Sequence, residues 1–171
     1  MKNFYITGVS GVGKSSVAEK LKKKGIYTID IDEVEGLCDW INNDTQKISY
    51  WYSGIDKEFF ETHKYICDKE KLVTLINKGN NNIVVVVGLV DNQSEFLNLF
   101  DKIFLFHCDE KVFLKRIKER TNNNFGKHES DQEMILGWYK DFNKDMLNKG
   151  VISIDTDKSL EDVVKEVLSK F

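Results

Sequence analysis

The sequence has no proline, and it contains only two arginines among its 25 basic residues. Its turns therefore depend on glycine, asparagine and aspartate, which tolerate the backbone angles that turns require. The three cysteines are far apart in the sequence and form no C-x-x-C pair: Cys38, Cys67 and Cys108. An odd number with this spacing argues against a disulfide framework or a structural zinc site. It favours reduced thiols in a cytoplasmic protein.

Long apolar segments and a strong excess of one charge are also missing. The longest apolar run, from Ile83 to Val90, is much shorter than the about 20 residues of a membrane-spanning helix. The first residues already have a strand pattern, so we expect no signal peptide. The net charge of −3 provides no basic surface for a nucleic acid polymer. We expect a monomer or homodimer whose partner is a small molecule, with no membrane contact.

The most specific motif is a glycine-rich loop between an apolar strand pattern and a helix pattern. Its sequence fits G-x-x-x-x-G-K-S, and its residues are Gly8, Val9, Ser10, Gly11, Val12, Gly13, Lys14 and Ser15. Glycines let the backbone N–H groups converge on an anion, and the following helix adds its positive end. This is a P-loop, and we predict that Lys14 reaches the β- and γ-phosphates of ATP. Ser15 would bind Mg²⁺, and Ser16 would cap the helix or face the α-phosphate.

Strand patterns alternate with helix patterns five times along the chain. We predict strands over 3–7, 26–30, 83–87, 102–107 and 151–155. The β-branched run 83–87 is typical of a parallel strand that is buried on both faces. Parallel strands need crossover connections, so the sequence predicts one three-layer α/β domain over residues 1–171.

Residues 33–79 interrupt this alternation, and we expect them to form a helical insertion with helices over 33–41, 56–65 and 68–77. The insertion contains no arginine but many aromatic residues: Trp40, Tyr50, Trp51, Tyr52, Phe59, Phe60 and Tyr65. Such rings either stack on a bound base or sugar, or form the core of the insertion itself. Trp51 is the aromatic side chain that we expect to contact a ligand. A second polar segment, 121–129, is predicted to be a loop.

Asp30 and Asp32 end the second strand, at the edge of the sheet where α/β proteins bind ligands. One carboxylate would hold a Mg²⁺-bound water, and the other would orient or deprotonate an acceptor hydroxyl. We assign Asp30 to the metal and Asp32 to the acceptor, with the reverse assignment left open. Asn92, after the third strand, is a further candidate for acceptor binding. The third strand ends in Val87 and Gly88 without an acid, which argues against a helicase or motor.

Arg116 and Arg120 lie four residues apart on one predicted helix face, directly before the loop 121–129. A guanidinium group binds phosphate oxygens through two parallel hydrogen bonds, which a lysine cannot do. Phosphoryl transfer depends mainly on charge neutralisation and alignment. We therefore predict that both arginines serve the phosphates. The alternative is that they form surface ion pairs with Glu110 or Glu119.

These features together resemble the small P-loop kinases, namely the adenylate kinases and their relatives, the shikimate and gluconate kinases. The resemblance implies a five-stranded parallel sheet in the order 2-3-1-4-5. It implies that the insertion 33–79 binds the acceptor and that 121–129 forms a short lid. It also implies that Arg116 packs against adenine, that Arg120 binds the transferring phosphates, and that the backbone after the fifth strand frames the adenine edge: Thr156, Asp157 and Lys158.

The sequence therefore predicts an ATP-dependent kinase with ATP and Mg²⁺ as its cofactors. It would transfer the γ-phosphoryl group to a small acceptor, most simply a hydroxyl of a nucleoside or sugar, with Lys14, Asp32 and Arg120 as catalytic residues. One alternative is a nucleoside monophosphate kinase, although such kinases hold their acceptor with an arginine of the insertion. The other alternative is an ATP-binding regulator or weak ATPase, whose turnover no small acceptor would raise.

Overall fold

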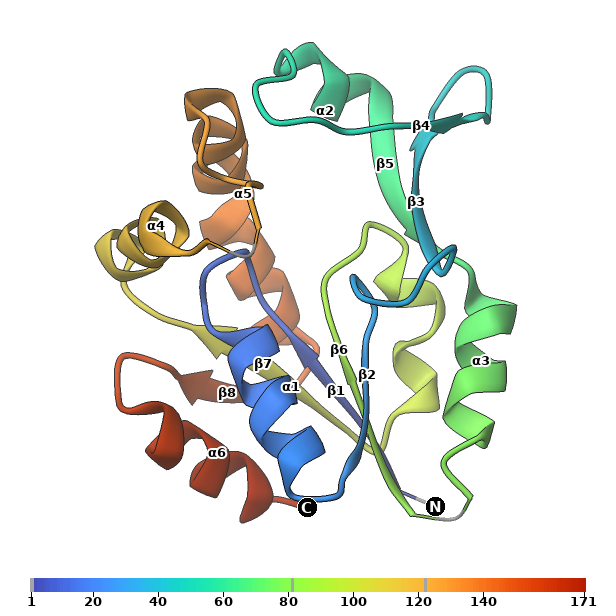
Figure 1. Cartoon of the computed structure of the whole chain (residues 1–171), viewed down its shortest axis with the longest axis vertical. Helices are drawn as coiled ribbons and strands as arrows, with labels where there is room; N and C mark the ends of the chain where they lie inside the picture. Colours follow the sequence, from blue (N-terminus) through green and yellow to red (C-terminus); the bar gives the residue numbers. More distant parts are fainter. Residues whose placement is uncertain (1, 81, 122) are drawn as a thin grey trace.

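The protein is described here by a computed structural model, which covers residues 2–80, 82–121 and 123–171. The lid expected over 121–129 is therefore described in part. Five parallel strands form the central sheet: β1 (Lys2–Thr7), β2 (Tyr27–Asp30), β6 (Ile83–Val87), β7 (Lys102–His107) and β8 (Ile152–Asp155). Their order is β2-β6-β1-β7-β8 (Figure 1). Counted within this sheet alone, the order is 2-3-1-4-5, which confirms the predicted parallel α/β fold.

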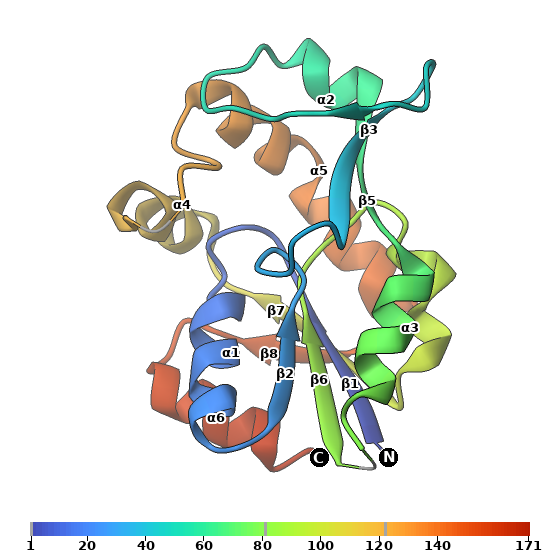
Figure 2. The same cartoon turned by 45° about the vertical axis from the view of Figure 1, so that its right-hand side comes forward.

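The strand β6 is buried on both faces, as its β-branched run predicts. Phe4 and Ile6 of β1 pack into one apolar cluster together with α1 (Lys14–Lys23) and α6 (Leu160–Leu168). Tyr5, the residue between them, packs into a second cluster with α3 (Lys69–Asn77). This alternation follows from the two-residue period of a strand. The result is a three-layer domain with helices on both faces of the sheet (Figures 1 and 2).

Two further helices follow β7 in the chain. The first contains Arg116 and ends at Arg120, and the lid segment connects it to the second. These helices are α4 (Glu110–Glu119) and α5 (Glu129–Asn148). The helix α4 begins at Asp109, whose side chain accepts a hydrogen bond from the backbone N–H of Lys111. Arg120 ends α4, and Phe113 and Ile117 of this helix are buried in the first cluster. This packing fixes α4 beside the P-loop. None of the helices among the described residues has both the length and the apolar character needed to cross a membrane.

The insertion differs from the prediction of a helical segment. It contains a second, antiparallel sheet in the order β4-β3-β5, formed by β3 (Cys38–Asn42), β4 (Ile48–Ser49) and β5 (His63–Cys67). The helix predicted over 33–41 was therefore wrong, because β3 occupies its second half. Of the helix predicted over 56–65, only α2 (Glu58–Thr62) is formed. The helix predicted over 68–77 is confirmed as α3.

The aromatic residues explain why this segment forms a sheet. The ring of Trp40 in β3 lies 5.2 Å from that of Phe59, 5.7 Å from that of Phe60 and 5.3 Å from that of Tyr65. Trp40 and Tyr65 are directly opposite each other in the β3–β5 pairing. Cross-strand aromatic pairs of this kind stabilise a sheet that has little other core. Most of the aromatic side chains of the insertion thus form its own small core.

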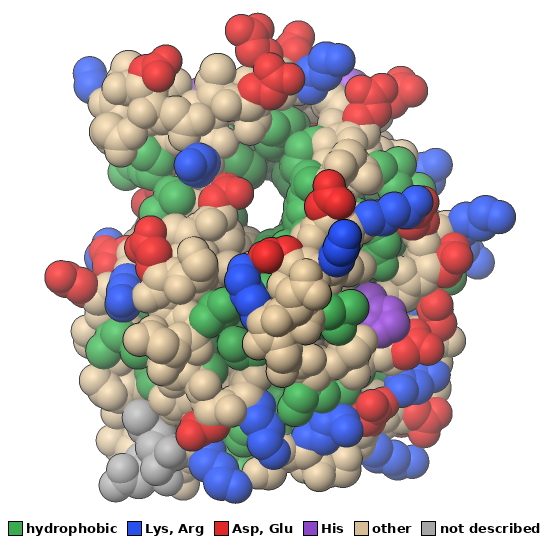
Figure 3. All heavy atoms as spheres, turned by 180° about the vertical axis from the view of Figure 1, so that it is seen from behind, with side chains coloured by type: hydrophobic (Ala, Val, Ile, Leu, Met, Phe, Trp, Pro, Cys, Tyr) green, Lys and Arg blue, Asp and Glu red, His purple; other side chains and the backbone are tan. Residues whose placement is uncertain are grey.

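The insertion lies above the carboxyl-terminal edge of the central sheet (Figures 1 and 2). It leaves the body of the domain after Asp32 and returns to it through β5 and α3. Seen from behind, an opening passes through the molecule between the insertion and the body (Figure 3). The insertion thus forms a roof over the edge where open α/β sheets bind their ligands.

Candidate active site

The P-loop joins β1 to α1, and its shape depends on glycine at two close approaches. Gly8 has φ +145°, and a Cβ atom there would lie 2.4 Å from the backbone oxygen of Phe106. Gly11 has φ +86°, and its Cβ would lie 2.7 Å from the backbone oxygen of Phe113. Both φ values and both contacts disfavour any side chain. The loop is therefore packed against β7 and α4, which also brings Arg116 and Arg120 near it.

The Lys14 side chain is held inside this loop. Its Nζ donates hydrogen bonds to the backbone oxygens of Gly8, at 2.6 Å, and Val9, at 2.9 Å. Burial lowers the pKa of Lys14 to about 8, and the nearby carboxylates of Asp32 and Asp30 oppose this shift. A buried ammonium group is stabilised by an anion placed beside it. The loop and its lysine thus have the chemistry of a phosphate site.

Ser15 and Asp30 come together at the mouth of the P-loop. Asp30 is only 3% exposed. Its burial raises the pKa of the carboxyl group, and hydrogen bonds from Ser15 and from the Asp32 backbone oppose this rise. The distance from the Asp32 nitrogen to Asp30 Oδ1 is 3.3 Å. A hydroxyl and a carboxylate are oxygen ligands of the kind that Mg²⁺ takes, so these two residues fit the predicted metal role.

Asp32 is exposed, and it faces the P-loop pocket. The hydroxyl group of Tyr65 in β5 donates a hydrogen bond of 3.1 Å to Asp32 Oδ1. Burial raises the pKa of Tyr65, and the charge of Asp32 raises it further, so Tyr65 remains a donor. Sequence reasoning placed Tyr65 among the aromatic residues of the insertion but gave it no role. Its partner is not adjacent in the sequence, so no motif would have identified the contact.

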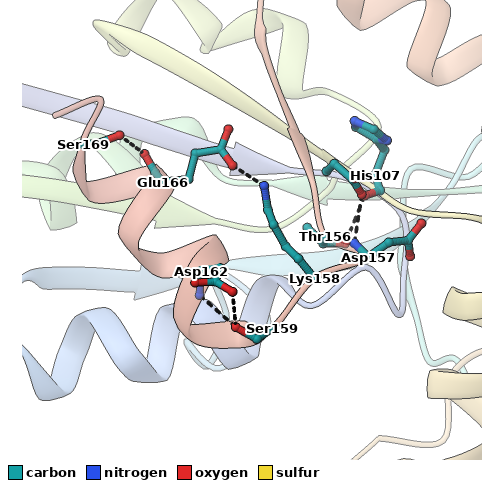
Figure 4. Close-up of polar contacts among 9 residues, drawn as sticks. His107, Thr156, Asp157, Lys158, Ser159, Asp162, Glu166 and Ser169 are labelled. Atoms are coloured by element: carbon teal, nitrogen blue, oxygen red, sulfur yellow. Dashed lines mark hydrogen bonds and ion pairs between the residues drawn. The ribbon is translucent and has the colours of Figure 1, made fainter.

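Arg116 holds the segment that follows β8. Its Nη2 donates a hydrogen bond of 2.8 Å to the backbone oxygen of Thr156, and its Nη1 lies 3.4 Å from Thr156 Oγ1. The Thr156 hydroxyl in turn donates to the His107 backbone oxygen at 3.0 Å, as Figure 4 shows. Asp157 accepts a bond of 3.0 Å from the backbone N–H of Asp109. The loop 156–158 is thus fixed to the ends of β7 and α4.

Arg120 points toward the lid. Its Nη2 donates a hydrogen bond to the backbone oxygen of Phe125. Its Nε is buried and has no hydrogen-bond partner among the described residues. Burial lowers the pKa of Arg120, and the charge of Asp32 opposes the shift. The guanidinium group of a partly buried arginine can donate hydrogen bonds to an anionic ligand.

The alternative prediction, that Arg116 and Arg120 form surface ion pairs with Glu110 or Glu119, is wrong. Glu110 pairs with Lys140 at 3.2 Å, and Glu119 lies 3.9 Å from Lys115. Neither glutamate pairs with an arginine among the ion pairs of residues 2–80, 82–121 and 123–171. The guanidinium groups therefore remain directed at the site.

A pocket of about 390 Å³ joins these parts. It is lined by the P-loop, the start of α1, Asp32, both arginines, Thr156 and Lys158. Most of the predicted nucleotide residues are thus brought together, but Gly8, Val9 and Asp157 are not in the lining, and neither is the predicted metal ligand Asp30. Trp51 and Asn92, the other predicted acceptor residues, are also outside this lining.

Trp51 instead joins the insertion to the lid. Its ring lies 5.3 Å from that of Phe125 at an angle of 63°, and its Nε1 is buried without a partner among the described residues. A hydrogen bond of 3.1 Å from Ser130 Oγ to the Ile55 backbone oxygen adds a second connection. The insertion and the lid are therefore in contact with each other above the pocket.

Asn92 is bonded to the backbone of β5. Its Oδ1 accepts from the Cys67 nitrogen at 3.0 Å, and its Nδ2 donates to the Cys67 oxygen at 3.0 Å. The neighbouring Asp91 accepts from the Tyr65 nitrogen at 2.6 Å. The loop after β6 thus supports the insertion, and the acceptor role of Asn92 stays a prediction.

Comparison with known proteins agrees with this geometry. Residues 5–137 match the model of a family described as an AAA domain. The chain is 29% identical to a shikimate kinase from Thermodesulfovibrio yellowstonii over 140 residues, which cover 79% of this chain and 75% of that protein. The fold is similar to that of a deoxyadenosine kinase from M. mycoides with bound dCTP, with a TM-score of 0.57, 18% identity and coverage of 98% and 97%. A gluconokinase from Sinorhizobium meliloti has a TM-score of 0.54 and 20% identity, covering 98% of this chain and 90% of its own.

Proposed function

The chain belongs to the AAA domain family, and we propose that it transfers the γ-phosphoryl group of ATP to a hydroxyl group of a small, unphosphorylated acceptor. The general class of the reaction is that of its named relatives: the protein is a small P-loop kinase, an ATP-dependent phosphotransferase. The observation that carries the finer proposal is that Lys14, Asp32 and Arg120 share one pocket. This pocket joins an anion site to a carboxylate at the edge of the sheet.

ATP would be held at both ends of this pocket. The backbone of residues 8–15, with Lys14, supplies donors for the phosphates, and the start of α1 adds its positive end. Arg116 and the loop 156–158 would frame the adenine ring, because Arg116 fixes Thr156 in place. Arg120 would neutralise the charge of the phosphoryl group during transfer, because this side chain lines the same pocket as Lys14.

Ser15 and Asp30 would hold Mg²⁺. The bound ion would neutralise charge on the phosphate oxygens during the transfer. Asp30 suits this position because it is buried and lies beside Ser15. Asp32 is exposed to the pocket, which leaves it for the acceptor.

Asp32 would accept the proton of the acceptor hydroxyl while the hydroxyl oxygen attacks the γ-phosphorus. The bond between that phosphorus and the bridging oxygen of ADP then breaks. Tyr65 would position Asp32 through its hydrogen bond of 3.1 Å. General base catalysis requires the base to lie within hydrogen-bond reach of the reacting proton, so the proposal places the acceptor hydroxyl beside Asp32.

The charge distribution favours a hydroxyl acceptor over a phosphorylated one. The cations that line the pocket come from the P-loop, from α4 and its end, and from the loop after β8: Lys14, Arg116, Arg120 and Lys158. All of them lie on the side that we assign to ATP. The insertion 33–79, which we propose as the acceptor-binding segment, has no arginine. Trp51 would contact the acceptor or close over it, together with the lid 121–129.

An acceptor screen tests this proposal. The release of ADP is measured with ATP and Mg²⁺ in the presence of nucleosides, sugars, sugar acids and nucleoside monophosphates. We expect at least one hydroxyl compound to raise turnover, and its product to be a phosphate monoester. Stimulation by monophosphates alone would contradict the proposal and favour a nucleoside monophosphate kinase. A slow rate that no compound raises would favour an ATP-binding regulator or weak ATPase.

A further inference from the structure

Two of the three cysteines, which are far apart in the sequence, are neighbours in the structure. Cys38 begins β3 and Cys67 ends β5, and the two residues are directly opposite each other in the antiparallel pairing. Cys67 is 1% exposed, and Cys38 is half-buried. Both pack into the apolar cluster beneath the insertion. Their side chains therefore lie on the same side of the small sheet.

The backbone hydrogen bonds show which kind of antiparallel pair this is. The N–H and C=O groups of Cys67 are both bonded to Asn92, on the side away from β3. The next residue, Asp68, donates its N–H to the Leu37 oxygen at 2.9 Å. Because these bonds alternate along an antiparallel ladder, Cys38 and Cys67 form a non-hydrogen-bonded pair. In such a pair the Cα atoms are about 4.5 Å apart and the side chains are closest.

This spacing suits a disulfide. Disulfides span Cα separations of roughly 4.4–6.8 Å, so the pair needs little backbone movement to be oxidised. The two thiols already interact, since a hydrogen bond from the Cys38 thiol lowers the pKa of Cys67. A lower pKa increases the fraction of thiolate, which is the reactive form.

The position of the pair gives the bond a mechanical effect. Cys38 and Cys67 are the residues through which the chain enters and leaves the small sheet of the insertion. Residues 39–66 between them contain β4, α2, Trp51 and Tyr65. We call this pair of residues the neck of the insertion. A covalent bond between them would close residues 39–66 into one loop whose two ends are fixed to the body of the domain.

We propose that Cys38 and Cys67 are a reversible disulfide site that clamps the neck of the insertion. The oxidant is a peroxide. One thiolate attacks a peroxide oxygen, the O–O bond breaks, and a sulfenic acid and one water are formed. The second sulfur then attacks the sulfenic sulfur, the S–O bond breaks, and a second water leaves. Two electrons pass from the two sulfurs to the peroxide, and a dithiol reductant reverses the change. The inference does not depend on the proposed acceptor.

The test treats the full chain with hydrogen peroxide, blocks the remaining thiols with N-ethylmaleimide and maps the peptides by mass spectrometry. We expect Cys38 and Cys67 in one linked peptide pair, and Cys108 in its alkylated form. Dithiothreitol should restore three alkylated cysteines. Alkylation of both neck cysteines after oxidation, or their conversion to sulfinic acid, would overturn the proposal.

Thermal unfolding tests the clamp itself. The disulfide should raise Tm by roughly 5–15 °C, because it restricts a long loop of the unfolded chain. The rise should persist in Cys108→Ser and disappear in Cys38→Ser, and in Cys67→Ala as a second variant if the first folds poorly. A linked protein with an unchanged Tm would show that the bond does not hold the neck.

Discussion

The hydroxyl group of Tyr65 donates a hydrogen bond of 3.1 Å to the carboxylate of Asp32. Tyr65 belongs to β5 of the insertion, whereas Asp32 follows β2 of the central sheet. The backbone of Tyr65 is also tied to Asp91, which follows β6. The insertion is therefore bonded to Asp32, the acid that we assign to the acceptor. The position of the insertion thus determines the direction of the Asp32 side chain.

Removing this hydroxyl should affect transfer more than nucleotide binding. Tyr65→Phe keeps the ring against Trp40 but removes the bond to Asp32. One hydrogen bond to a charged group contributes about 1.5–3 kcal/mol, so we expect kcat to fall about 10-fold with KM for ATP unchanged. The matched control is Tyr27→Phe, since the Tyr27 hydroxyl bonds to the Leu75 oxygen instead. Steady-state kinetics showing a raised KM for ATP and a normal kcat would count against this role.

Asp32→Asn should separate binding from chemistry. The amide retains the size of the carboxylate and can still accept a bond from Tyr65, but it cannot take a proton. We expect ATP to bind with nearly wild-type affinity by calorimetry, and the acceptor-dependent rate to fall about 10²–10⁴-fold. Asp44→Asn, on an exposed turn of the insertion, is the control. Transfer at a normal rate in Asp32→Asn would show that another group serves the acceptor.

The two arginines should have different kinetic effects. Arg120→Lys retains the charge but loses the planar donor group, so kcat should fall at least about 10-fold with a smaller change in KM for ATP. Arg116→Lys loses the bonds to Thr156 and should mainly raise KM for ATP, by about 5-fold. When kcat and KM for ATP are measured for both variants, each variant serves as the control for the other. An exchange of the two patterns would contradict the assigned positions.

Lys14 should make ATP binding depend on pH. Its pKa in the free protein is lowered to about 8, so much of it is neutral at pH 8.5. Phosphate stabilises the charged form, and binding should therefore take up roughly 0.7 proton at pH 8.5 and less at pH 7. Affinity should fall as pH rises above 8. Calorimetry in two buffers with different ionisation enthalpies measures this uptake, and Lys14→Met should abolish it. Equal uptake in both proteins would assign the proton to another group.

The same shift has a consequence for the stability of the ligand-free protein. The unfolded chain keeps its Lys14 proton up to about pH 10.5, whereas the folded protein loses it near pH 8. Between these values the unfolded state binds more protons. The contribution of Lys14 to the free energy of unfolding therefore rises with pH, which stabilises the folded protein. Chemical denaturation of wild type and Lys14→Met at pH 7.5 and 9.5 measures the difference. A contribution that falls over this range would contradict the sign.

The central sheet and the pocket around the P-loop were predictable from local sequence. The P-loop lies between β1 and α1, and its spacing alone specifies the positions of Lys14 and Ser15. The β-branched run of β6 and the turn signals between elements specify the order of strands along the chain. Asp30 and Asp32 could be placed because Asp30 ends β2 and Asp32 lies two residues beyond it. In each case the informative residues are adjacent in the sequence.

The insertion could not be predicted in the same way. Its strands are short, and β3 is specified by cross-strand contacts of Trp40 with residues more than fifteen positions away. The segment 33–41 also has residues at helical spacing, so the local pattern favoured a helix that tertiary packing excluded. The Tyr65–Asp32 bond and the Cys38–Cys67 pair depend on that packing, and both were missed for the same reason.

The most direct test of the account is a crystal structure with Mg²⁺ and a non-hydrolysable ATP analogue. We predict that the triphosphate lies on the backbone of residues 8–15 and that Lys14 Nζ leaves the oxygens of Gly8 and Val9 to contact phosphate. Arg120 should face the γ-phosphate, and Ser15 and Asp30 should be near the ion. A nucleotide bound elsewhere, or a Lys14 that still bonds only to its own loop, would contradict the account.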